Sequence, residues 1–376
     1  AARRGKDLVY AGKVGTGFSS ASLASIAPKL RALAANATSV KNAPRGRAIH
    51  WVKPELVCEV EFSEITADGI LRHPAFRGLR QDKPARDVVF ERPAKVSNAD
   101  KVLFPDCGVT KGELAEYLER VSAWMLPHVA RRPLMLVRCP NGISRCFVQK
   151  HATVHLPASV KRVDVGDDEE LTMVDDARGL VGLAQAGVVE IHTWGARAGS
   201  IERPDLVVLD LDPDPSVKWK EIVSAARLVR ERLEDLGLEP FVKTTGGKGL
   251  HVVCAIGPSM TWDAAKELSG GIARAIVKEE PSRFVATMTK AKRKGKIFID
   301  FFRNGRGATF IAPYSPRSRP GAPVAMPVDW DELDDIAPDR FTVRNALERL
   351  GAQKRDPWEK LKRTWTRTRS SSRSRG

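Results

Sequence analysis

The segment from Pro204 to Pro213 constrains this chain more than any other, because it reads as a buried strand that ends in two acids. An apolar Leu-Val-Val-Leu run leads into aspartates at positions 210 and 212. Side chains two residues apart in a strand point to the same face, so Asp210 and Asp212 are expected to project together. Like charges this close repel each other unless cations share them. The alternative is a strand end with exposed acids beside a Pro-Asp-Pro turn.

A third acid lies in a second apolar run, Lys-Ile-Phe-Ile-Asp-Phe-Phe, at position 300. Two carboxylates on one strand and a third on another are typical of sites that hold two Mg²⁺ or Mn²⁺ ions. Such ions activate a 3′-hydroxyl and stabilise a leaving pyrophosphate. Asp210, Asp212 and Asp300 are therefore the candidate catalytic residues and metal ligands.

Length and charge narrow the class of partner. The chain has 376 residues, enough for two or three domains, and a formal net charge of +16. This charge favours nucleic acid over an acidic membrane as partner, and the alternative is a merely basic soluble protein. No run approaches the ~20 apolar residues of a membrane span. The first residues hold no apolar stretch, so no signal peptide is expected, and the missing initiator Met indicates a fragment or a processed chain.

The five cysteines, at positions 58, 107, 139, 146 and 254, are scattered and form no Cys-x-x-Cys pair. We therefore expect free, mostly buried thiols in a reducing compartment, and a cytoplasmic, nucleoid-associated protein. Cys139, Cys146, His151 and His155 raise the question of a zinc site, but their spacing is irregular.

Residues 1–93 read as a small domain of short strands with one helix, which suits a β-barrel of the OB type. The helix is expected over Ser20–Ala35 with Ser20 as its N-cap. A linker is expected over 82–96. The strands are expected over Leu8–Val14, Ile49–Val52, Leu56–Ile65 and Gly69–Arg72.

Residues 97–350 alternate strands and helices, which predicts an α+β domain with the aspartate strands at its centre. Thr110 and Glu113 form a capping-box pattern before a helix. The longest helix is expected over Ser216–Leu236, ending at Gly237. Residues 351–376 are basic and rich in Ser and Thr, so they are expected to be a disordered tail.

The segment Phe241–His251 predicts a strand, a glycine turn that carries Lys248, and a second strand that carries His251. Glycines let backbone N–H groups approach an anion, and lysine adds a positive charge. The segment is not a Walker loop, since a strand rather than a helix follows it. The alternatives are a triphosphate site and a plain hairpin with a surface lysine.

These motifs in this order resemble the archaeo-eukaryotic primase superfamily. Residues 97–320 resemble the polymerase domain of bacterial ligase D, an end-joining enzyme. The segments that carry the resemblance are 99–105, 137–142, 190–195, 204–213, 243–251, 300–309 and 313–320. The resemblance implies a mixed α/β primase-polymerase domain that uses nucleoside triphosphates and two Mn²⁺ or Mg²⁺ ions.

The resemblance also implies roles for single residues. The nucleotide-binding residues would be His192, Thr245, Lys248, His251, Arg317 and Arg319. Lys101 and Lys111 would recognise a 5′-phosphate at the downstream end of a gap or broken end. Arg138, Phe147 and Lys150 would lie along the template or nucleotide path. The family stacks DNA on two adjacent aromatic residues here, and this chain has Val148 after Phe147.

Residues 8–17, 56–62 and 73–83 resemble the OB domain that ends an ATP-dependent DNA ligase. The last motif, 77–83, would orient the pyrophosphate of ATP. No Lys-x-Asp-Gly motif occurs, because Thr66 stands where residues 66–69 would need the nucleophilic lysine. We therefore expect a ligase-then-polymerase arrangement cut before the OB domain, without ligase activity in these residues.

Together these features predict a DNA repair polymerase that extends primer 3′-ends at double-strand breaks and short gaps. The resemblance implies a preference for ribonucleotides and manganese, and a Ku-like end-binding partner. The alternatives are a non-catalytic DNA end-binding module, a DNA ligase and a metal-dependent nuclease. A nuclease shares the acids but has no need of a triphosphate-binding turn.

Overall fold

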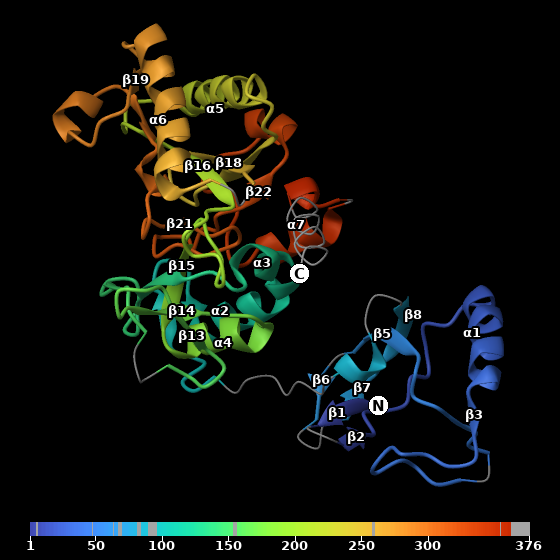
Figure 1. The fold of residues 1–376 in the computed structure, drawn as a ribbon. Coiled ribbons are helices and arrows are strands. Elements are labelled where there is room, and N and C mark those ends of the chain that lie inside the picture. Colours follow the sequence, from blue (N-terminus) through green and yellow to red (C-terminus); the bar gives the residue numbers. More distant parts are fainter. Residues whose placement is uncertain are drawn as a thin grey trace. The chain divides into compact units, whose positions relative to one another are not determined.

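The chain divides into two units, Ala1–Pro93 and Ala94–Gly376 (Figure 1). The computed structural model describes residues 1–4, 7–46, 48–62, 64–66, 70–80, 84–88, 96–152, 156–257, 260–353 and 355–361. Asp82, Lys83, His155, most of the expected linker and residues 362–376 lie outside the described residues. Within the described part, no helix combines the length and the apolar character that crossing a membrane requires.

The first unit consists of short antiparallel strand pairs, one α-helix and a 3₁₀ turn. Helix α1 spans Ser20–Ala32, and the 3₁₀ turn η1 spans Ala85–Asp87. The strand pairs are β1 (Ala2–Arg4) with β2 (Asp7–Val9), β3 (Ala34–Ala35) with β4 (Trp51–Val52), β5 (Val57–Glu61) with β8 (Ala75–Arg80), and β6 (Glu64–Ile65) with β7 (Leu71–Arg72).

The pair β5–β8 carries the main apolar contact of this unit. Phe76 is buried and stacks on Phe18, with 4.7 Å between ring centroids. Gly17 runs so close to this strand that a Cβ would lie 2.3 Å from the Phe76 carbonyl oxygen. This approach, together with a φ of +85° at Gly17, requires a glycine there.

Three details of the first unit differ from the sequence expectations. Ser19, not Ser20, caps helix α1, because its hydroxyl accepts the Ser22 backbone N–H at 3.1 Å. The expected strand Leu8–Val14 ends at Val9. Strand β8 was not expected, since Gly78 in its middle weakens the strand pattern.

Two six-stranded sheets form the framework of the second unit. The first has the order β13–β14–β11–β15–β21, with β12 also paired to β11. Its strands are β11 (Leu134–Arg138), β12 (Phe147–Gln149), β13 (Lys161–Asp164), β14 (Glu170–Met173), β15 (Val188–Thr193) and β21 (Phe310–Ile311). A separate hairpin joins β9 (Val102–Phe104) to β10 (Val109–Thr110).

The second sheet has the order β19–β20–β16–β18–β17–β22, antiparallel except for the parallel pair β19–β20. Its strands are β16 (Leu206–Pro213), β17 (Pro240–Thr244), β18 (Leu250–Ala255), β19 (Phe284–Val285), β20 (Ile297–Asp300) and β22 (Pro327–Val328). The aspartate strands β16 and β20 are neighbours near its middle, as the sequence predicts.

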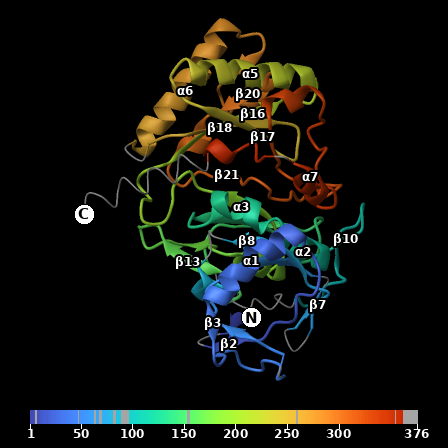
Figure 2. The same ribbon diagram turned by 90° about the vertical axis from the view of Figure 1, so that its right-hand side faces the viewer.

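Helices cover both sheets (Figures 1 and 2). Helices α5 (Trp219–Glu234) and α6 (Trp262–Glu279) pack on the second sheet. Helices α2 (Lys111–Arg120), α3 (Ser122–Val129) and α4 (Ala177–Gln185) lie with the first. The remaining helical segments are η2 (Lys290–Arg293), η3 (Phe302–Asn304), η4 (Trp330–Asp334) and α7 (Ala346–Ala352).

The helix bounds refine the expectations. Thr110 caps α2, and Glu113 closes the expected capping box. The predicted helix Ser216–Leu236 is α5, whose 16 residues are fewer than the 18 of α6. It is shorter because Lys218, with Glu221 three residues later, caps its start. Helix α6 was not recognised as the longer one from its sequence.

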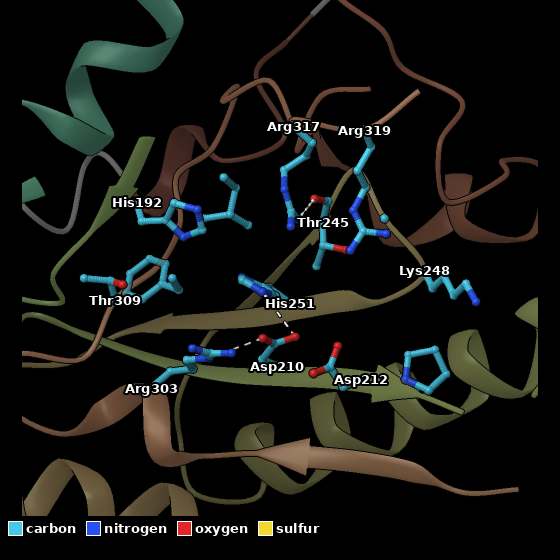
Figure 3. A pocket seen from close by; sticks show the side chains of 14 residues that line it. His192, Asp210, Asp212, Thr245, Lys248, His251, Arg303, Thr309, Arg317 and Arg319 are labelled. Carbon is cyan, nitrogen blue, oxygen red and sulfur yellow. Dashed lines mark hydrogen bonds and ion pairs between the residues drawn. The ribbon is translucent and has the colours of Figure 1, made fainter. Parts of the chain in front are cut away.

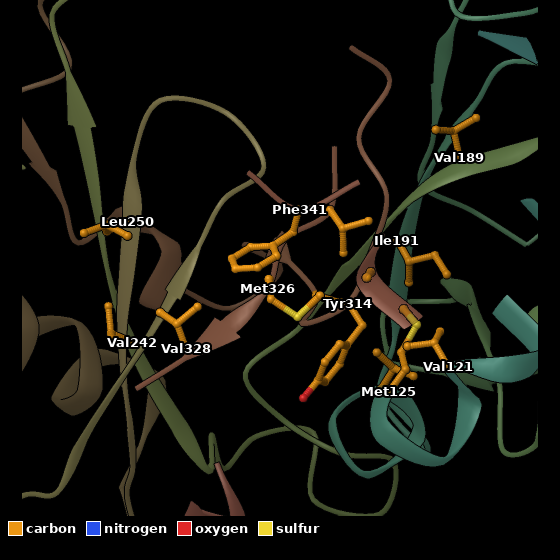
Figure 4. Close-up of a cluster of buried hydrophobic side chains, with 14 of the residues drawn as sticks. Val121, Met125, Val189, Ile191, Val242, Leu250, Tyr314, Met326, Val328 and Phe341 are labelled. Atoms are coloured by element: carbon orange, nitrogen blue, oxygen red, sulfur yellow. The ribbon is translucent and has the colours of Figure 1, made fainter. Parts of the chain in front are cut away.

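One apolar core joins the two sheets of this unit (Figure 4). Val189 and Ile191 come from β15 in the first sheet, and Val242 and Leu250 come from the second. Tyr314 lies between them, and its phenol is fully buried beside Met125 and Phe341. Burial of these side chains fixes one sheet against the other.

Residues 355–361 correct the expected start of the disordered tail. Trp358 is 2% exposed, lies 6.1 Å from Phe241 between ring centroids, and donates its indole N–H to the Val242 carbonyl at 3.0 Å. Leu361 is fully buried. Two apolar residues within a mainly charged stretch therefore anchor it to the second sheet, which composition alone did not indicate.

The cysteines also differ from expectation. Cys139 and Cys146 form a disulfide across the end of the β11–β12 hairpin, so these two thiols are not free. Cys58 is exposed, Cys107 is half-buried and only Cys254 is a buried free thiol. The hairpin register brings Arg138 opposite Phe147, which places the next residue on each strand within disulfide reach. Cysteines paired in this way are not available to the zinc site considered above.

Candidate nucleotidyl-transfer site

Four neighbouring strands of the second sheet place one ionisable residue each in a row. Lys243 on β17 pairs with His251 on β18, and His251 pairs with Asp210 on β16. Asp210 in turn pairs with Asp300 on β20. Directly opposed residues in an antiparallel sheet project to the same face, so the four side chains share one face. Asp212, two residues along β16, projects to this face as well.

A cavity of about 290 Å³ opens over this face (Figure 3). This volume lies near the lower end of the range for ligand pockets, about 300–1,000 Å³. All the residues assigned to nucleotide binding from the sequence line it, together with two of the three acids. The lining residues are His192, Asp210, Asp212, Pro213, Thr245, Gly247, Lys248, His251, Arg303, Thr309, Phe310, Ile311, Arg317 and Arg319.

The carboxylates of the site carry opposing electrostatic influences. Burial opposes ionisation of Asp210, yet His251 and Arg303 outweigh it and hold its pKa at about 2. Although Asp212 is an exposed residue, partial desolvation of its carboxyl in the pocket and the Asp210 charge raise its pKa to about 6. Burial likewise raises the pKa of Asp300. Raised pKa values in a carboxylate cluster indicate a site that a divalent cation would stabilise.

Arg303 lies between two of these acids. Its Nε is 3.1 Å from Asp300 Oδ2 and 3.5 Å from Asp210 Oδ2 (Figure 3). In the part of the chain that the structure describes, no group of three or more His, Cys, Asp or Glu side chains is arranged to hold a metal ion. The three carboxylates nevertheless supply an oxygen-only donor set of the kind that Mg²⁺ and Mn²⁺ take.

Lys243 and His251 continue the row behind the acids. Lys243 is fully buried, and burial lowers its pKa well below the ordinary value. Burial and then the Lys243 charge lower the pKa of His251 to about 4, and His251 Nε2 lies 3.3 Å from Asp210 Oδ1. Lys243 was not singled out from the sequence, because its place in an apolar strand gives no sign that it faces the acids.

The glycine turn between β17 and β18 packs directly on the aspartate strand. A Cβ at Gly249 would lie 2.2 Å from the Leu211 carbonyl oxygen, so only glycine allows this approach. The Thr245 hydroxyl donates to the Gly249 carbonyl at 3.1 Å, and Arg317 Nη1 donates to the Thr245 carbonyl at 2.6 Å. The turn is thus held open, with Lys248 at the pocket.

The five residues assigned to DNA lie outside the pocket. Lys101 is exposed and donates to Asn141 at 3.0 Å, whereas Lys111 is buried and donates to the Ser97 carbonyl at 3.0 Å. Burial and then the charge of Lys101 lower the pKa of Lys111, which shows that the two amines are near each other.

The remaining three lie along the β11–β12 hairpin and the residue that follows it. The Arg138 guanidinium stands 5.5 Å from the Phe147 ring centroid. Phe147 and Val148 are 49% and 64% exposed, so an apolar surface is present at this position despite the missing second aromatic ring. Lys150 Nζ lies 3.3 Å from Glu169.

Comparisons with known proteins agree with this architecture. Residues 110–358 match the family described as LigD, primase-polymerase domain, and residues 1–83 match the ATP dependent DNA ligase C terminal region. The multifunctional non-homologous end joining protein LigD of Pseudomonas aeruginosa is 38% identical over 384 residues, covering 93% of this chain and 46% of that protein. The corresponding Mycobacterium tuberculosis protein is 35% identical over 272 residues, covering 69% and 36%.

A solved structure is also similar. The polymerase domain from Mycobacterium tuberculosis ligase D, in complex with DNA, gives a TM-score of 0.67 at 34% identity. It covers 72% of this chain and 99% of that one.

The mixed α/β fold, with acidic strands facing a cationic glycine turn, defines a nucleotidyltransferase of the primase-polymerase class. Members of this class use nucleoside triphosphates and divalent metal ions. The chain belongs to the LigD primase-polymerase domain family, and a ligase C-terminal region of the OB type precedes that domain. It spans less than half the length of the two LigD relatives described above.

Proposed function

We propose that this chain is the polymerase part of a DNA end-joining enzyme, which adds nucleotides to primer 3′-ends at double-strand breaks and short gaps. The observation that carries the proposal is the single pocket in which acidic strands face a cationic turn. Carboxylates suit metal ions and a reacting hydroxyl, whereas Lys248, Arg317 and Arg319 suit a triphosphate. Neither half alone would require the other.

Asp210, Asp212 and Asp300 would hold two divalent ions, Mn²⁺ or Mg²⁺, once Arg303 leaves the position between Asp210 and Asp300. When bound, the ions supply activation of the 3′-hydroxyl and stabilisation of the leaving pyrophosphate. Thr245, His251 and His192 border the same cavity and would orient the nucleotide. Lys243, behind His251, adds positive charge beneath the acids.

DNA would approach along the surface that carries Lys101, Arg138 and Phe147. The formal net charge of +16 supports binding to a polyanion, and the exposed Phe147 supports stacking on a base. Lys101, with Lys111 near it, would meet a 5′-phosphate on the downstream strand, and Lys150 would lie along the template path. A Ku-like end-binding protein and the cytoplasm are the partner and the location that this role implies.

The match of residues 1–83 to a ligase C-terminal region favours a second activity, strand sealing, for the enzyme to which the first unit contributes. Ligation requires a lysine that becomes adenylated within a nucleotide pocket. The 376 residues contain no Lys-x-Asp-Gly motif. We therefore expect no adenylation of this polypeptide.

A primer-extension assay tests these proposals together. The substrate is a gapped duplex with a labelled primer, nucleoside triphosphates and MnCl₂. The proposed function predicts primers lengthened in a triphosphate-dependent way. Shortened primers would indicate a nuclease, unchanged primers a binding module, and a sealed product or an adenylated chain a ligase.

A further inference from the structure

Glu190 lies behind the pocket, two residues before His192 on strand β15. Its side chain is only 7% exposed, and the function proposed above assigns it no role. A buried carboxylate is costly unless it is paired and hydrogen-bonded, so the contacts of Glu190 identify its role.

Both oxygens of Glu190 are engaged. Oε2 lies 2.9 Å from His192 Nε2 and 3.2 Å from Arg317 Nε. Oε1 accepts the Ser318 backbone N–H at 2.8 Å and the Ser318 hydroxyl at 2.6 Å. One carboxylate therefore contacts two pocket residues and the residue that separates Arg317 from Arg319.

Arg317 extends this connection to the second sheet. Its Nη1 donates to the Thr245 carbonyl at 2.6 Å, at the start of the glycine turn (Figure 3). The series Glu190, Arg317 and Thr245 thus spans from β15 of the first sheet to the turn after β17 of the second. A change at Glu190 would be felt on both sides of the pocket.

The same carboxylate determines the tautomer of His192. An ionised carboxylate only accepts hydrogen bonds, so Nε2 must carry the proton and Nδ1 of the neutral ring is left as the acceptor. Burial lowers the pKa of His192, which favours the neutral ring. Burial alone would raise the pKa of Glu190, but His192 and Arg317 outweigh it and hold the carboxyl ionised.

We propose that Glu190 is a positioning residue, which holds His192 as the Nε2–H tautomer and fixes Arg317 against the glycine turn. A nucleoside triphosphate then meets both side chains already in place. Fixing them before binding reduces the loss of side-chain freedom on binding. The inference rests on the proposed function and extends it, since it concerns how the same pocket recognises its nucleotide.

The variant E190Q separates charge from shape. One amide group must replace an oxygen, and each oxygen position faces a backbone or side-chain N–H. No rotation of a glutamine amide therefore restores every contact. If the NH₂ group faces His192, it forces the ring into the Nδ1–H form.

Binding of ATP with MnCl₂, measured by titration calorimetry, should be about tenfold or more weaker for E190Q, as expected when charge-assisted contacts are lost. The affinity for gapped DNA should stay unchanged. Imidazole ¹⁵N spectra should show His192 leaving the Nε2–H form. In an H192A background, E190Q should weaken ATP binding less than it does alone.

Asp205 provides a matched control. It is also a largely buried carboxylate held by two arginines, 2.6 Å from Arg132 Nη1 and 3.1 Å from Arg197 Nε, but it does not line the pocket. D205N should lower thermal stability and leave ATP affinity unchanged. If E190Q does not fold, E190D decides: it keeps the charge on a shorter side chain and should bind ATP more weakly than the unmodified protein.

The outcomes distinguish the two proposals. Equal ATP affinity of the unmodified protein and the folded Glu190 variant would overturn the inference alone. Loss of ATP affinity in D205N to the same extent would also overturn it, since the effect would then be general destabilisation. Absence of ATP binding by the unmodified protein would refute the proposed function and this inference with it.

Discussion

Lys101 and Lys111 differ in exposure, and this difference separates their expected effects. Lys101 is exposed, so K101A should keep its stability while losing the preference for gaps with a 5′-phosphate, about fivefold or more. Lys111 donates to Ser97 from a buried position, so K111A should also lower the free energy of unfolding by about 1–2 kcal/mol. Binding titrations on phosphorylated and unphosphorylated gaps, at two salt concentrations, measure the preference.

The exposed Lys220 on α5 serves as the control, and K220A should keep the preference. If K101A discriminates as well as the unmodified protein does, Lys101 is ordinary surface charge.

Asp212 predicts how metal affinity depends on pH. Its pKa is raised to about 6, and a metal ion binds the ionised carboxylate. The affinity for Mn²⁺ should therefore increase as pH rises through about 6 and level off above it. The metal-free protein should become less stable over the same rise, because the folded state ionises Asp212 less readily than the unfolded chain does.

Calorimetric Mn²⁺ titrations and thermal unfolding in EDTA, both across this pH range, check the two trends. The D212N protein provides the comparison, and its thermal stability should depend less on pH. A Mn²⁺ affinity of the unmodified protein that is independent of pH would contradict the raised pKa.

Among the elements, the β11–β12 hairpin has the least expected feature, its disulfide. Closing a short loop between Cys139 and Cys146 should stabilise the protein by about 2–3 kcal/mol relative to the reduced form. Alkylation of the denatured chain without reductant should label Cys58, Cys107 and Cys254 only. Labelling of all five cysteines under those conditions would show that the thiols are reduced.

The elements that the sequence predicts well are those with a strong local pattern. The strand that carries Asp210 and Asp212, the glycine turn and the capped helix after Thr110 each combine an apolar period with a recognisable end. Strand β8 and the helix α6 boundaries lack such an end signal. Pairing of Cys139 with Cys146 depends on strand register, which the spacing of cysteines does not reveal.

At the scale of the whole molecule, the sequence indicated which residues gather in the pocket better than how they are connected. Motifs identify side chains that would meet a substrate, such as Lys248 and Arg319. Glu190 and Arg303 act on other side chains across sheets or turns, and Lys243 reaches the site through cross-strand pairing. Such contacts depend on the packing of two sheets, so no local pattern reports them. The buried Trp358 likewise depends on tertiary packing.

The central claim, metal-assisted nucleotidyl transfer at the acidic strands, is tested most directly by primer extension with D212A. The account predicts a loss of about 1,000-fold or more in the rate of nucleotide addition, with DNA affinity nearly unchanged, because phosphate contacts rather than the acids carry DNA affinity. Asp214 is the matched control, since its carboxylate accepts the Ser216 backbone N–H outside the pocket, and D214A should extend primers normally. Extension by D212A at the rate of the unmodified protein would contradict the account.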